Sequence, residues 1–226
     1  MKISVVMPVL NEAKNLQHTL TSLKLTEQEE LIVVDGNSSD DTVSLARRFT
    51  KNVFIAEKGR ARQMNFGAEK AEGDILLFLH ADCELPEHGF TLIRNILKNT
   101  GVAAGAFDLS IDHPAWRFRV IAFGANLRSR ITGIPYGDQG IFMAKEVFME
   151  VGGFAEIPLM EDVEISGRLK RIGKIIFVKP PIKTSPRRWL TEGAFSTTLR
   201  DWSNVLLYRF LKVDPERLAR YYRDIR

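Results

Sequence analysis

The stretch Ile75-Leu76-Leu77-Phe78-Leu79-His80-Ala81-Asp82-Cys83-Glu84-Leu85-Pro86 decides how this chain folds. Its first five residues are apolar without interruption, which is typical of a strand buried on both faces. We therefore expect His80, Asp82 and Glu84 at the carboxyl end of a strand, the edge of an open α/β sheet where ligands bind. Two carboxylates one residue apart can share a divalent cation, although a solvated turn fits the same segment taken alone.

The residues before this stretch predict three strand-then-helix units. Apolar or β-branched runs predict strands at residues 3–8, 31–34 and 53–55. Helical spacing of apolar residues follows each run, over residues 11–23, 42–49 and 61–71, and Asp40 or Asp41 can cap the second helix. Such a succession predicts a mainly parallel α/β sheet flanked by helices, with right-handed crossovers.

The residues after this stretch predict a second half with more varied elements. We expect helices at residues 89–98 and 116–130, strands at 102–111, 141–144 and 175–178, a helix from about residue 160 and a final amphipathic helix over 195–210. Pro180 and Pro181 are expected to end the last strand. The apolar face of residues 116–130 fits either core packing or contact with a lipid surface.

Composition and charge indicate a globular, soluble protein. The chain has 226 residues, of which 45% are hydrophobic, so it can bury a sizeable core. Cys83 is the single cysteine, which excludes an intramolecular disulfide and fits a reducing compartment. No segment approaches the ~20 apolar residues of a membrane span, and the first apolar run is too short for a signal peptide. We therefore expect a cytoplasmic location.

Basic residues are concentrated toward the end of the chain. Residues 179–226 contain eleven Lys and Arg against five Asp and Glu, whereas the whole chain carries a formal charge of +4. We expect residues 1–178 to form the main domain and residues 179–226 a basic amphipathic extension packed on or beside it. This extension could contact the inner face of an anionic membrane, bind a phosphorylated acceptor or be simply solvated. No nucleic-acid recognition motif accompanies it, so nucleic acid is not an expected partner.

Acidic side chains recur where predicted strands end or helices begin. Asp35 precedes the Asp40-Asp41 loop, Asp82 is followed by Glu84, and Glu161-Asp162 opens a helix. Each cluster alone has a structural explanation, as a turn or as the acidic first turn of a helix. Their order along one strand–helix chain indicates a common site.

The ordered motifs resemble those of the family 2 glycosyltransferases. They are Met7-Pro8-Val9-Leu10-Asn11-Glu12, Val33-Val34-Asp35-Gly36-Asn37-Ser38-Ser39-Asp40-Asp41-Thr42, Gly59-Arg60 with Asn65 and Gly67, His80-Ala81-Asp82, Gly152-Gly153-Phe154 and Glu161-Asp162. The resemblance runs to about residue 173 and implies a GT-A fold, a nucleotide-diphosphate-sugar donor with UDP favoured, a divalent metal (Mn²⁺ or Mg²⁺) and inversion at the anomeric carbon. The chain is similar in particular to a short, soluble bacterial subgroup with HAD in place of DXD, which is labelled as associated with arsenosugar biosynthesis.

By this resemblance the donor-binding residues are Pro8, Asn11, Glu12, Asp35, Arg60, His80, Asp82, Arg188 and Trp189. Asp82 would hold the metal almost alone, with Glu84 or water completing its ligands, because His80 replaces the first aspartate of the motif and imidazole is a poor ligand for Mg²⁺. Arg188 and Trp189 match the family's QxxRW motif, in which Ser185 stands here for the glutamine.

Asp162 matches the catalytic base of the family, with Glu161 beside it at the catalytic centre. Glu161 and Glu164 are expected to raise the pKa of Asp162 by like-charge repulsion. Tyr136, Asp138 and Gln139 lie in a glycine-rich loop that we interpret as an acceptor-side lid, an ordinary crossover loop being the alternative. Cys83 is expected to be a packed thiol and not a nucleophile.

Four other functions compete with soluble sugar transfer, and two of them fit the motifs. A membrane-surface glycosyltransferase acting on a lipid or carotenoid acceptor fits the same motifs, and so does a non-catalytic nucleotide-binding scaffold. A nucleotidyltransferase is disfavoured, because residues 8–12 contain no glycine-rich phosphate loop. A dinucleotide dehydrogenase is also disfavoured, because no GxGxxG follows the first predicted strand.

Overall fold

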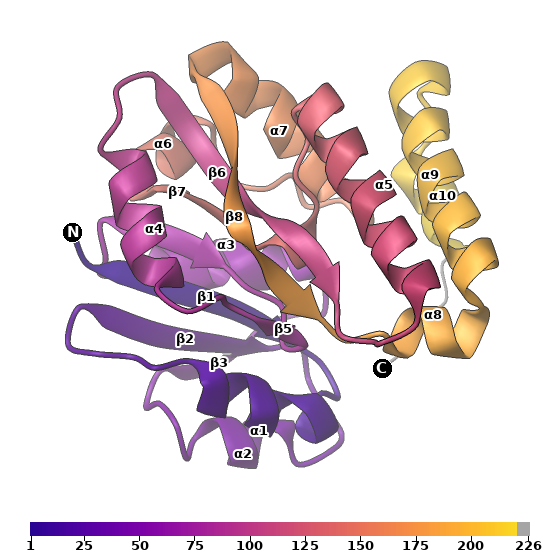
Figure 1. Ribbon diagram of the computed structural model, residues 1–226. Helices are drawn as coiled ribbons and strands as arrows, with labels where there is room; N and C mark the ends of the chain where they lie inside the picture. The colour runs from indigo at the N-terminus through magenta and orange to yellow at the C-terminus, as the bar shows by residue number, and fades with distance from the viewer. Residues whose placement is uncertain (221–226) are drawn as a thin grey trace.

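The computed structural model describes residues 1–220, and one twisted sheet runs through its centre (Figure 1). The strand order is β3-β2-β1-β4-β7-β6-β8-β5. The strands are β1 (Ile3–Val9), β2 (Glu29–Asp35), β3 (Val53–Ile55), β4 (Ile75–Phe78), β5 (Cys83–Glu84), β6 (Val102–Ile111), β7 (Ile141–Ala144) and β8 (Lys174–Thr184). Strands β1 to β4 are parallel, as are β6 and β8, whereas β7 runs antiparallel to both its neighbours and β5 antiparallel to β8. The mainly parallel α/β sheet predicted from the sequence is confirmed.

Helices cover both faces of this sheet (Figure 1). They are α1 (Ala13–Ser22), α2 (Thr42–Ala46), α3 (Arg60–Lys70), α4 (Gly89–Leu97), α5 (Trp116–Thr132), α6 (Lys145–Glu150), α7 (Glu161–Ile172), α8 (Arg187–Glu192), α9 (Ala194–Leu211) and α10 (Pro215–Arg220), with a 3₁₀ turn η1 (Gly137–Gln139). Residues of α1, α2, α4 and α5 share one core cluster with the sheet, and residues of α3, α6 and α7 share the other.

The buried central strands explain the apolar run at the start of β4. Ile75, Leu77 and Leu79 belong to the core on the α1 side, whereas Leu76 and Phe78 belong to the core on the α3 side. Because side chains alternate across a strand, a strand covered on both faces must be apolar at every position. This run therefore fixes the centre of the sheet, and its polar continuation lies at the carboxyl edge.

Gly67 of the predicted motif allows α3 to approach β1 closely. A Cβ atom at this position would lie 2.4 Å from Cγ1 of Val6, well inside van der Waals contact. Since α3 begins at Arg60, the same close packing fixes where that arginine enters the carboxyl edge of the sheet.

The expected end of the last strand at Pro180 and Pro181 is wrong. β8 continues through both prolines to Thr184 and pairs with β6 on either side of them. Its register advances from Val178 opposite Phe107 to Ile182 opposite Leu109, so β8 uses four residues where β6 uses two. Pro180 and Pro181 lie in this irregular stretch between the paired residues, where no N–H has to be donated to β6. β8 therefore also crosses the boundary expected between residues 178 and 179.

The C-terminal extension forms three helices and not the single one expected over residues 195–210. Gly193, with φ of 91°, separates α8 from α9, and α10 follows after a short connection. Val205 and Leu218 pack in a third core cluster with Ile134 and Val163 of the preceding domain. Residues 221–226, the end of the expected basic extension, lie outside the described part. No helix within residues 1–220 is long and apolar enough to cross a membrane.

Candidate active site

The loops after β1 and β2 are tied to each other at the carboxyl edge. Asp35 ends β2, is buried, and accepts a hydrogen bond from the backbone N–H of Ser38 at 2.8 Å. The N–H of Asn11 donates to Ser38 Oγ at 2.8 Å, and Asn11 Oδ1 accepts from the N–H of Ser39 at 2.8 Å. Pro8 lies half-buried in β1, opposite Val34. These contacts bring together the residues predicted to border the nucleobase and ribose.

Glu12 is linked to the C-terminal extension by a bidentate ion pair. Its Oε2 and Oε1 accept from Nη1 and Nη2 of Arg187 at 2.8 and 2.6 Å. The same guanidinium lies 3.4 Å from Oδ2 of Asp82, the aspartate that follows β4. Arg187 is the first residue of α8, so the extension reaches directly into the predicted donor site.

Asp82 lies in an environment that opposes its ionisation. Burial raises the pKa of its carboxyl, Arg187 lowers it and Glu12 raises it. Glu84, expected to supplement Asp82, lies in β5, and its Oε1 is 2.6 Å from Nε2 of His18 on α1. Glu84 is thus engaged with α1.

Cys83, between these two acids, is completely buried. Its Sγ lies 3.6 Å from both the Asp138 carbonyl oxygen and Thr184 Oγ1. Burial raises the pKa of the Cys83 thiol, with a further rise from Asp82. These features are those of a packed, protonated thiol.

Asp162 is held by two backbone donors at the start of α7. Its Oδ2 accepts from the N–H of Gly137 at 3.1 Å and its Oδ1 from the N–H of Val163 at 2.8 Å. Burial raises its pKa to about 6, the charge of Glu161 adds to the rise, and Arg60 opposes it. Glu164, also expected to raise this pKa, forms an ion pair with Arg168 along α7.

Arg60 forms an ion pair with Glu161, whose side chain is almost fully buried. This pair joins the first turn of α3 to the first turn of α7, at the edge where the strands end. The second carboxylate oxygen of Glu161 is also buried and has no hydrogen-bond partner among residues 1–220. The predicted diphosphate residue and the predicted catalytic pair therefore lie in one cluster.

His80 packs against the backbone of the glycine-rich loop. A Cβ atom at Gly137 would lie 2.7 Å from Cε1 and Nε2 of the His80 ring, so only glycine admits the ring in this place. Because the N–H of Gly137 also binds Asp162, the HAD turn and the predicted base are separated by a single residue of η1.

Gln139 holds η1 in shape. Its Oε1 accepts from Ser129 Oγ at 2.9 Å and from the N–H of Tyr136 at 3.0 Å, and its Nε2 donates to the Phe107 carbonyl at 3.1 Å. Asp138, next to it, has its pKa raised by burial and lowered by Arg128 and Arg188.

Tyr136 presents a buried hydroxyl near Asp162, the predicted base. The guanidinium carbon of Arg128 lies 3.9 Å from the centre of its ring. Burial raises the pKa of Tyr136 to about 12, so the phenol is protonated at neutral pH. Within the described residues its hydroxyl has no hydrogen-bond partner, which leaves it able to bind an oxygen of a ligand.

Arg188 and Trp189 follow Arg187 in α8 and point to different surroundings. Arg188 Nη1 lies 3.9 Å from Asp201 Oδ2 on α9, and its charge lowers the pKa values of Asp82 and Asp138. Trp189 packs against the core cluster on the α1 face of the sheet. Trp189 therefore anchors α8, while the two arginines border the acidic residues of the site.

Residues 4–155 match the model of the family described as glycosyl transferase family 2. The chain belongs to this family. Among curated relatives, glycosyltransferase AglE of Haloferax volcanii is 30% identical over 123 residues, which cover 50% of this chain and 40% of AglE. The chain thus spans less than half the length of this relative.

Two solved structures share the fold. S. aureus TarS 1–349 in complex with UDP matches with a TM-score of 0.67 at 17% identity, covering 94% of this chain and 74% of TarS. The mannosyltransferase PcManGT of Pyrobaculum calidifontis, in complex with GDP-Man and Mn²⁺, matches with a TM-score of 0.63 at 20% identity, covering 81% of this chain and 56% of that protein. At these identities the likeness establishes the GT-A fold alone.

The side chains present fit a divalent cation only if a substrate shares it. No three His, Cys, Asp or Glu side chains in residues 1–220 are grouped so that they could hold a metal ion by themselves. Asp82 supplies a carboxylate at the carboxyl edge of the sheet, and protein-bound Mg²⁺ commonly has only one or two carboxylate ligands when substrate phosphates and water complete its coordination. The donor set therefore fits a metal held jointly with a diphosphate.

Two residues of the site were missed in the sequence. Arg187 was overlooked in favour of Arg188, which matches the family motif. Gln63 on α3 donates from Nε2 to the carbonyls of Val9 and Val34 at 2.8 and 2.7 Å, and so fixes the ends of β1 and β2. The Arg-Arg pair was the available signal for Arg187, whereas nothing in the sequence around Gln63 distinguishes it.

Proposed function

We propose that this chain transfers a sugar from a nucleotide-diphosphate donor to an acceptor hydroxyl with inversion at the anomeric carbon. The observation that carries the proposal is the buried carboxylate of Asp162, with a pKa of about 6, which the N–H of Gly137 holds at the point where His80 of the HAD turn packs. A base with a pKa near 6 is mostly ionised at neutral pH and can still accept a proton in the transition state.

Asp162 would remove the proton of the acceptor hydroxyl as that oxygen attacks the anomeric carbon. The N–H groups of Gly137 and Val163 keep the carboxylate in one orientation. The neighbouring carboxylate, Glu161, is occupied by Arg60. A single displacement by the acceptor, with Asp162 as the base, needs no covalent glycosyl-enzyme and inverts the configuration.

The donor would lie along the carboxyl edge from β2 to α8. Asn11 and Asp35, supported by Pro8 and Glu12, would border the base and ribose, and Arg60, His80 and Arg188 would lie toward the diphosphate. Asp82 would hold Mn²⁺ or Mg²⁺, which supplies positive charge for the leaving diphosphate when bound. UDP is the first choice of nucleotide because of the TarS complex, and GDP the second because PcManGT holds GDP-Man.

Tyr136 and Asp138 would contact the acceptor, and Gln139 would position them through its bonds to the loop. The buried hydroxyl of Tyr136 supports this assignment, since it can donate to an acceptor oxygen. The subgroup's association with arsenosugar biosynthesis stays a prediction, as do the cytoplasmic location and a lipid or carotenoid acceptor at the inner face of the membrane.

Nucleotide binding and turnover test this proposal in one set of proteins. We would measure thermal shifts with UDP, GDP and their sugars, with and without Mn²⁺, for the wild type, Asp82→Ala and Asp162→Asn. A Mn²⁺-dependent rise in melting temperature that Asp82→Ala abolishes and Asp162→Asn retains is expected, because a ligand of the native state stabilises it. Donor hydrolysis or transfer should then be lost in Asp162→Asn. Undiminished turnover in that variant would exclude Asp162 as the base, and nucleotide binding without any turnover would favour a non-catalytic scaffold.

A further inference from the structure

Helix α5 exposes a continuous apolar stripe in addition to the face that packs on the sheet. Phe118 and Ala122 are buried in the core, as expected for an amphipathic helix. The opposite stripe consists of Trp116, Val120, Phe123, Leu127 and Ile131, each between 47% and 76% exposed. Side chains three and four residues apart lie on one side of a helix, so these five form one row over four turns.

Helix α9 carries a second stripe with the same spacing. Its members are Phe195, Leu199, Trp202, Leu206 and Phe210, which are between 40% and 81% exposed. The intervals of four, three, four and four residues repeat those of α5. Both stripes combine bulky aliphatic side chains with aromatic ones, which are the side chains that insert at a membrane–water boundary.

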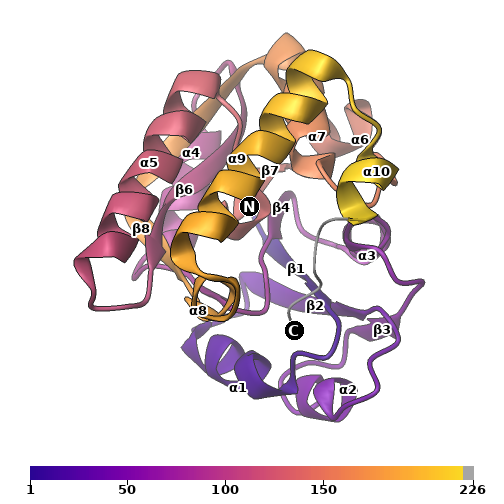
Figure 2. The same ribbon diagram turned by 90° about the vertical axis from the view of Figure 1, so that its right-hand side faces the viewer.

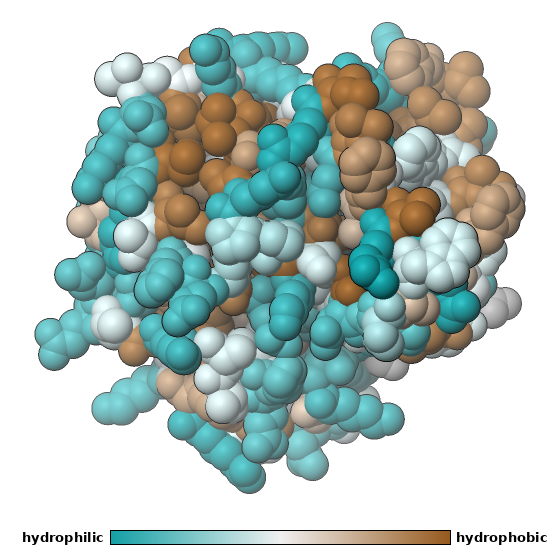
Figure 3. Space-filling view, in the orientation of Figure 1, coloured by the Kyte–Doolittle hydropathy of each residue, from teal (hydrophilic) through white to brown (hydrophobic). Residues whose placement is uncertain are grey.

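The two stripes lie side by side. α5 and α9 are neighbours that both begin near α8 and run in the same direction (Figure 2). Trp202 of α9 connects the two helices. A Cβ atom added to Gly124 of α5 would lie 3.7 Å from Cζ2 of Trp202, and the guanidinium carbon of Arg128 lies 5.4 Å from the centre of the Trp202 ring. Hydrophobic side chains accordingly gather over α5 and α9 on one side of the surface (Figure 3).

This α5–α9 face is too apolar for an unpartnered surface. Soluble monomers rarely expose a contiguous apolar patch of more than a few hundred Å², and single exposed side chains are the normal case. Here ten large apolar side chains, each at least 40% exposed, stand in two adjacent rows, so we expect a partner to cover them.

Charge distinguishes between two kinds of partner, a second copy of the chain and a lipid surface. α5 has four arginines and no acidic residue, and Arg117 and Arg119 are exposed on it. Arg209 and Lys212 are exposed at the far end of α9. A second copy of the chain, joined through the same face about a twofold axis, would bring these basic groups against each other. An anionic lipid surface would complement them instead.

We propose that the α5–α9 face binds peripherally to an anionic lipid bilayer, with its aromatic rows at the headgroup boundary. The acceptor then reaches the site from that surface; this part rests on the proposed function, whereas the binding itself does not. The route is short, because Arg128 of α5 contacts Trp202 on the face and Tyr136 at the site, and the residue after Tyr136 binds Asp162.

Vesicle flotation of the full chain tests the proposal. Phosphatidylcholine vesicles with phosphatidylglycerol should carry the wild type, and pure phosphatidylcholine vesicles should carry it poorly. Phe123→Asp with Phe195→Asp should weaken binding by roughly tenfold or more for each residue. Each substitution removes an apolar side chain that the bilayer would bury. Met149→Asp is the control, because Met149 on α6 is a large apolar residue that is also more than half exposed, at 57%, and lies outside the face.

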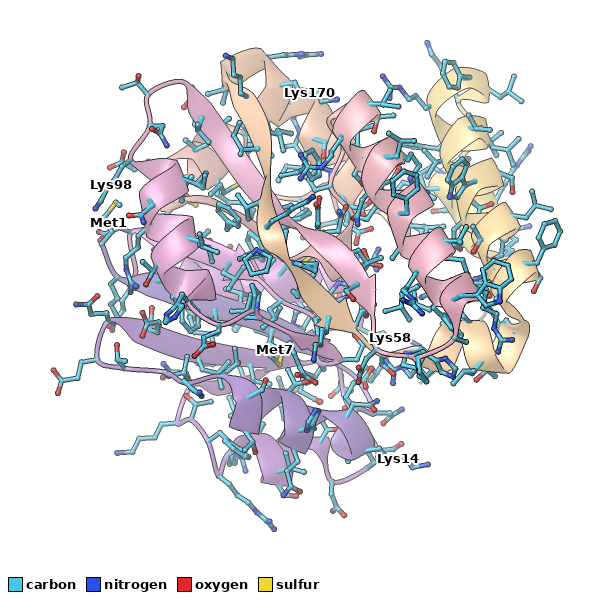
Figure 4. All side chains as sticks on the ribbon, in the orientation of Figure 1. Met1, Met7, Lys14, Lys58, Lys98 and Lys170 are labelled. Carbon is cyan, nitrogen blue, oxygen red and sulfur yellow. The ribbon has the colours of Figure 1, made fainter. Side chains whose placement is uncertain are left out.

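A charge-reversed pair separates lipid charge from apolar contact. Arg117→Glu with Arg119→Glu should lower binding to anionic vesicles, whereas Lys98→Glu at the end of α4, on the opposite side of the molecule from α9 in Figure 4, should bind as the wild type does. Asp162→Asn should also float normally, and Phe123→Asp with Phe195→Asp should keep the nucleotide-induced thermal shift. These two results distinguish failure of membrane binding from failure of the proposed reaction.

Two outcomes would overturn the proposal. One is flotation of the Phe123→Asp, Phe195→Asp protein equal to that of the wild type, or no flotation of the wild type with any vesicle. The other is a concentration-dependent dimer in sedimentation velocity that the same substitutions abolish, which would assign the face to a second copy.

Discussion

Both terminal nitrogens of Arg187 donate to the carboxylate of Glu12, at 2.8 and 2.6 Å, although 175 residues separate the two in the chain. The pair closes α8 over the loop after β1, and the same arginine approaches Asp82 at 3.4 Å. The C-terminal extension thus contributes a side chain to the proposed donor site.

Replacing Arg187 by Met should leave Glu12 buried without its partner. Loss of one member of a buried ion pair typically costs several kcal/mol, and we expect a fall of roughly 3 kcal/mol in the free energy of unfolding by urea. Adding Glu12→Gln should restore most of the loss, because the unpaired charge is then removed. Equal losses in the single and double variants would contradict an energetic coupling between the two residues.

The pH profile of kcat/KM should have an acidic limb, a fall toward low pH with its midpoint near pH 6. Asp162 must be ionised to accept a proton, and burial together with Glu161 raises its pKa to about 6. Below that pH the carboxyl is protonated and kcat/KM should fall about tenfold for each pH unit. A profile of kcat/KM between pH 4.5 and 8, recorded at ~0.5-unit steps, checks this; a flat profile down to pH 5 would exclude a single base of this kind.

Glu161 and Arg60 should move that limb in opposite directions. Glu161→Gln removes a negative charge that raises the pKa of Asp162, so the limb should shift to lower pH. Arg60→Gln removes a positive charge that lowers this pKa, so the limb should shift to higher pH. The comparison uses the pH profile and not the rate alone, because both substitutions also break the buried Arg60–Glu161 pair and lower stability.

Gly137→Ala should lower stability and kcat, because the added methyl group meets the His80 ring. The added methyl would lie 2.7 Å from the His80 ring, so the ring or η1 must move, at a cost of about 1–3 kcal/mol in the free energy of unfolding. Displacement of η1 should also weaken the bond from Gly137 to Asp162 and lower kcat. Combining Gly137→Ala with His80→Ala should recover stability, and no recovery would place the strain elsewhere.

The sheet could be predicted because its central strands are apolar on both faces. The run at residues 75–79 is apolar at every position, as a strand covered on both faces requires. The break predicted at Pro180 and Pro181 failed because a register irregularity between β6 and β8 removes the need for proline to donate, and pairing partners are not encoded locally.

Residue spacing alone could not assign the apolar residues of α5. The sequence left core packing and lipid contact open, since both use helical spacing, and the helix presents an apolar side chain on either side: Phe118 faces the sheet while Phe123 is 68% exposed. Arg187 was missed for a related reason. Its role depends on the distance to Glu12, which is set by the fold and not by the neighbouring motif residues.

Complete burial of the single cysteine gives this chain an internal reporter. Cys83 lies in β5, which pairs through two residues with the end of β8. A thiol reagent can reach the sulfur only when that short pairing opens, so the rate of alkylation in native conditions measures the opening of the strand that leads into α8. Since the folded protein offers no other thiol, a cysteine introduced on the exposed side of α5 would accept a fluorophore or spin label at one position, without any prior substitution of Cys83.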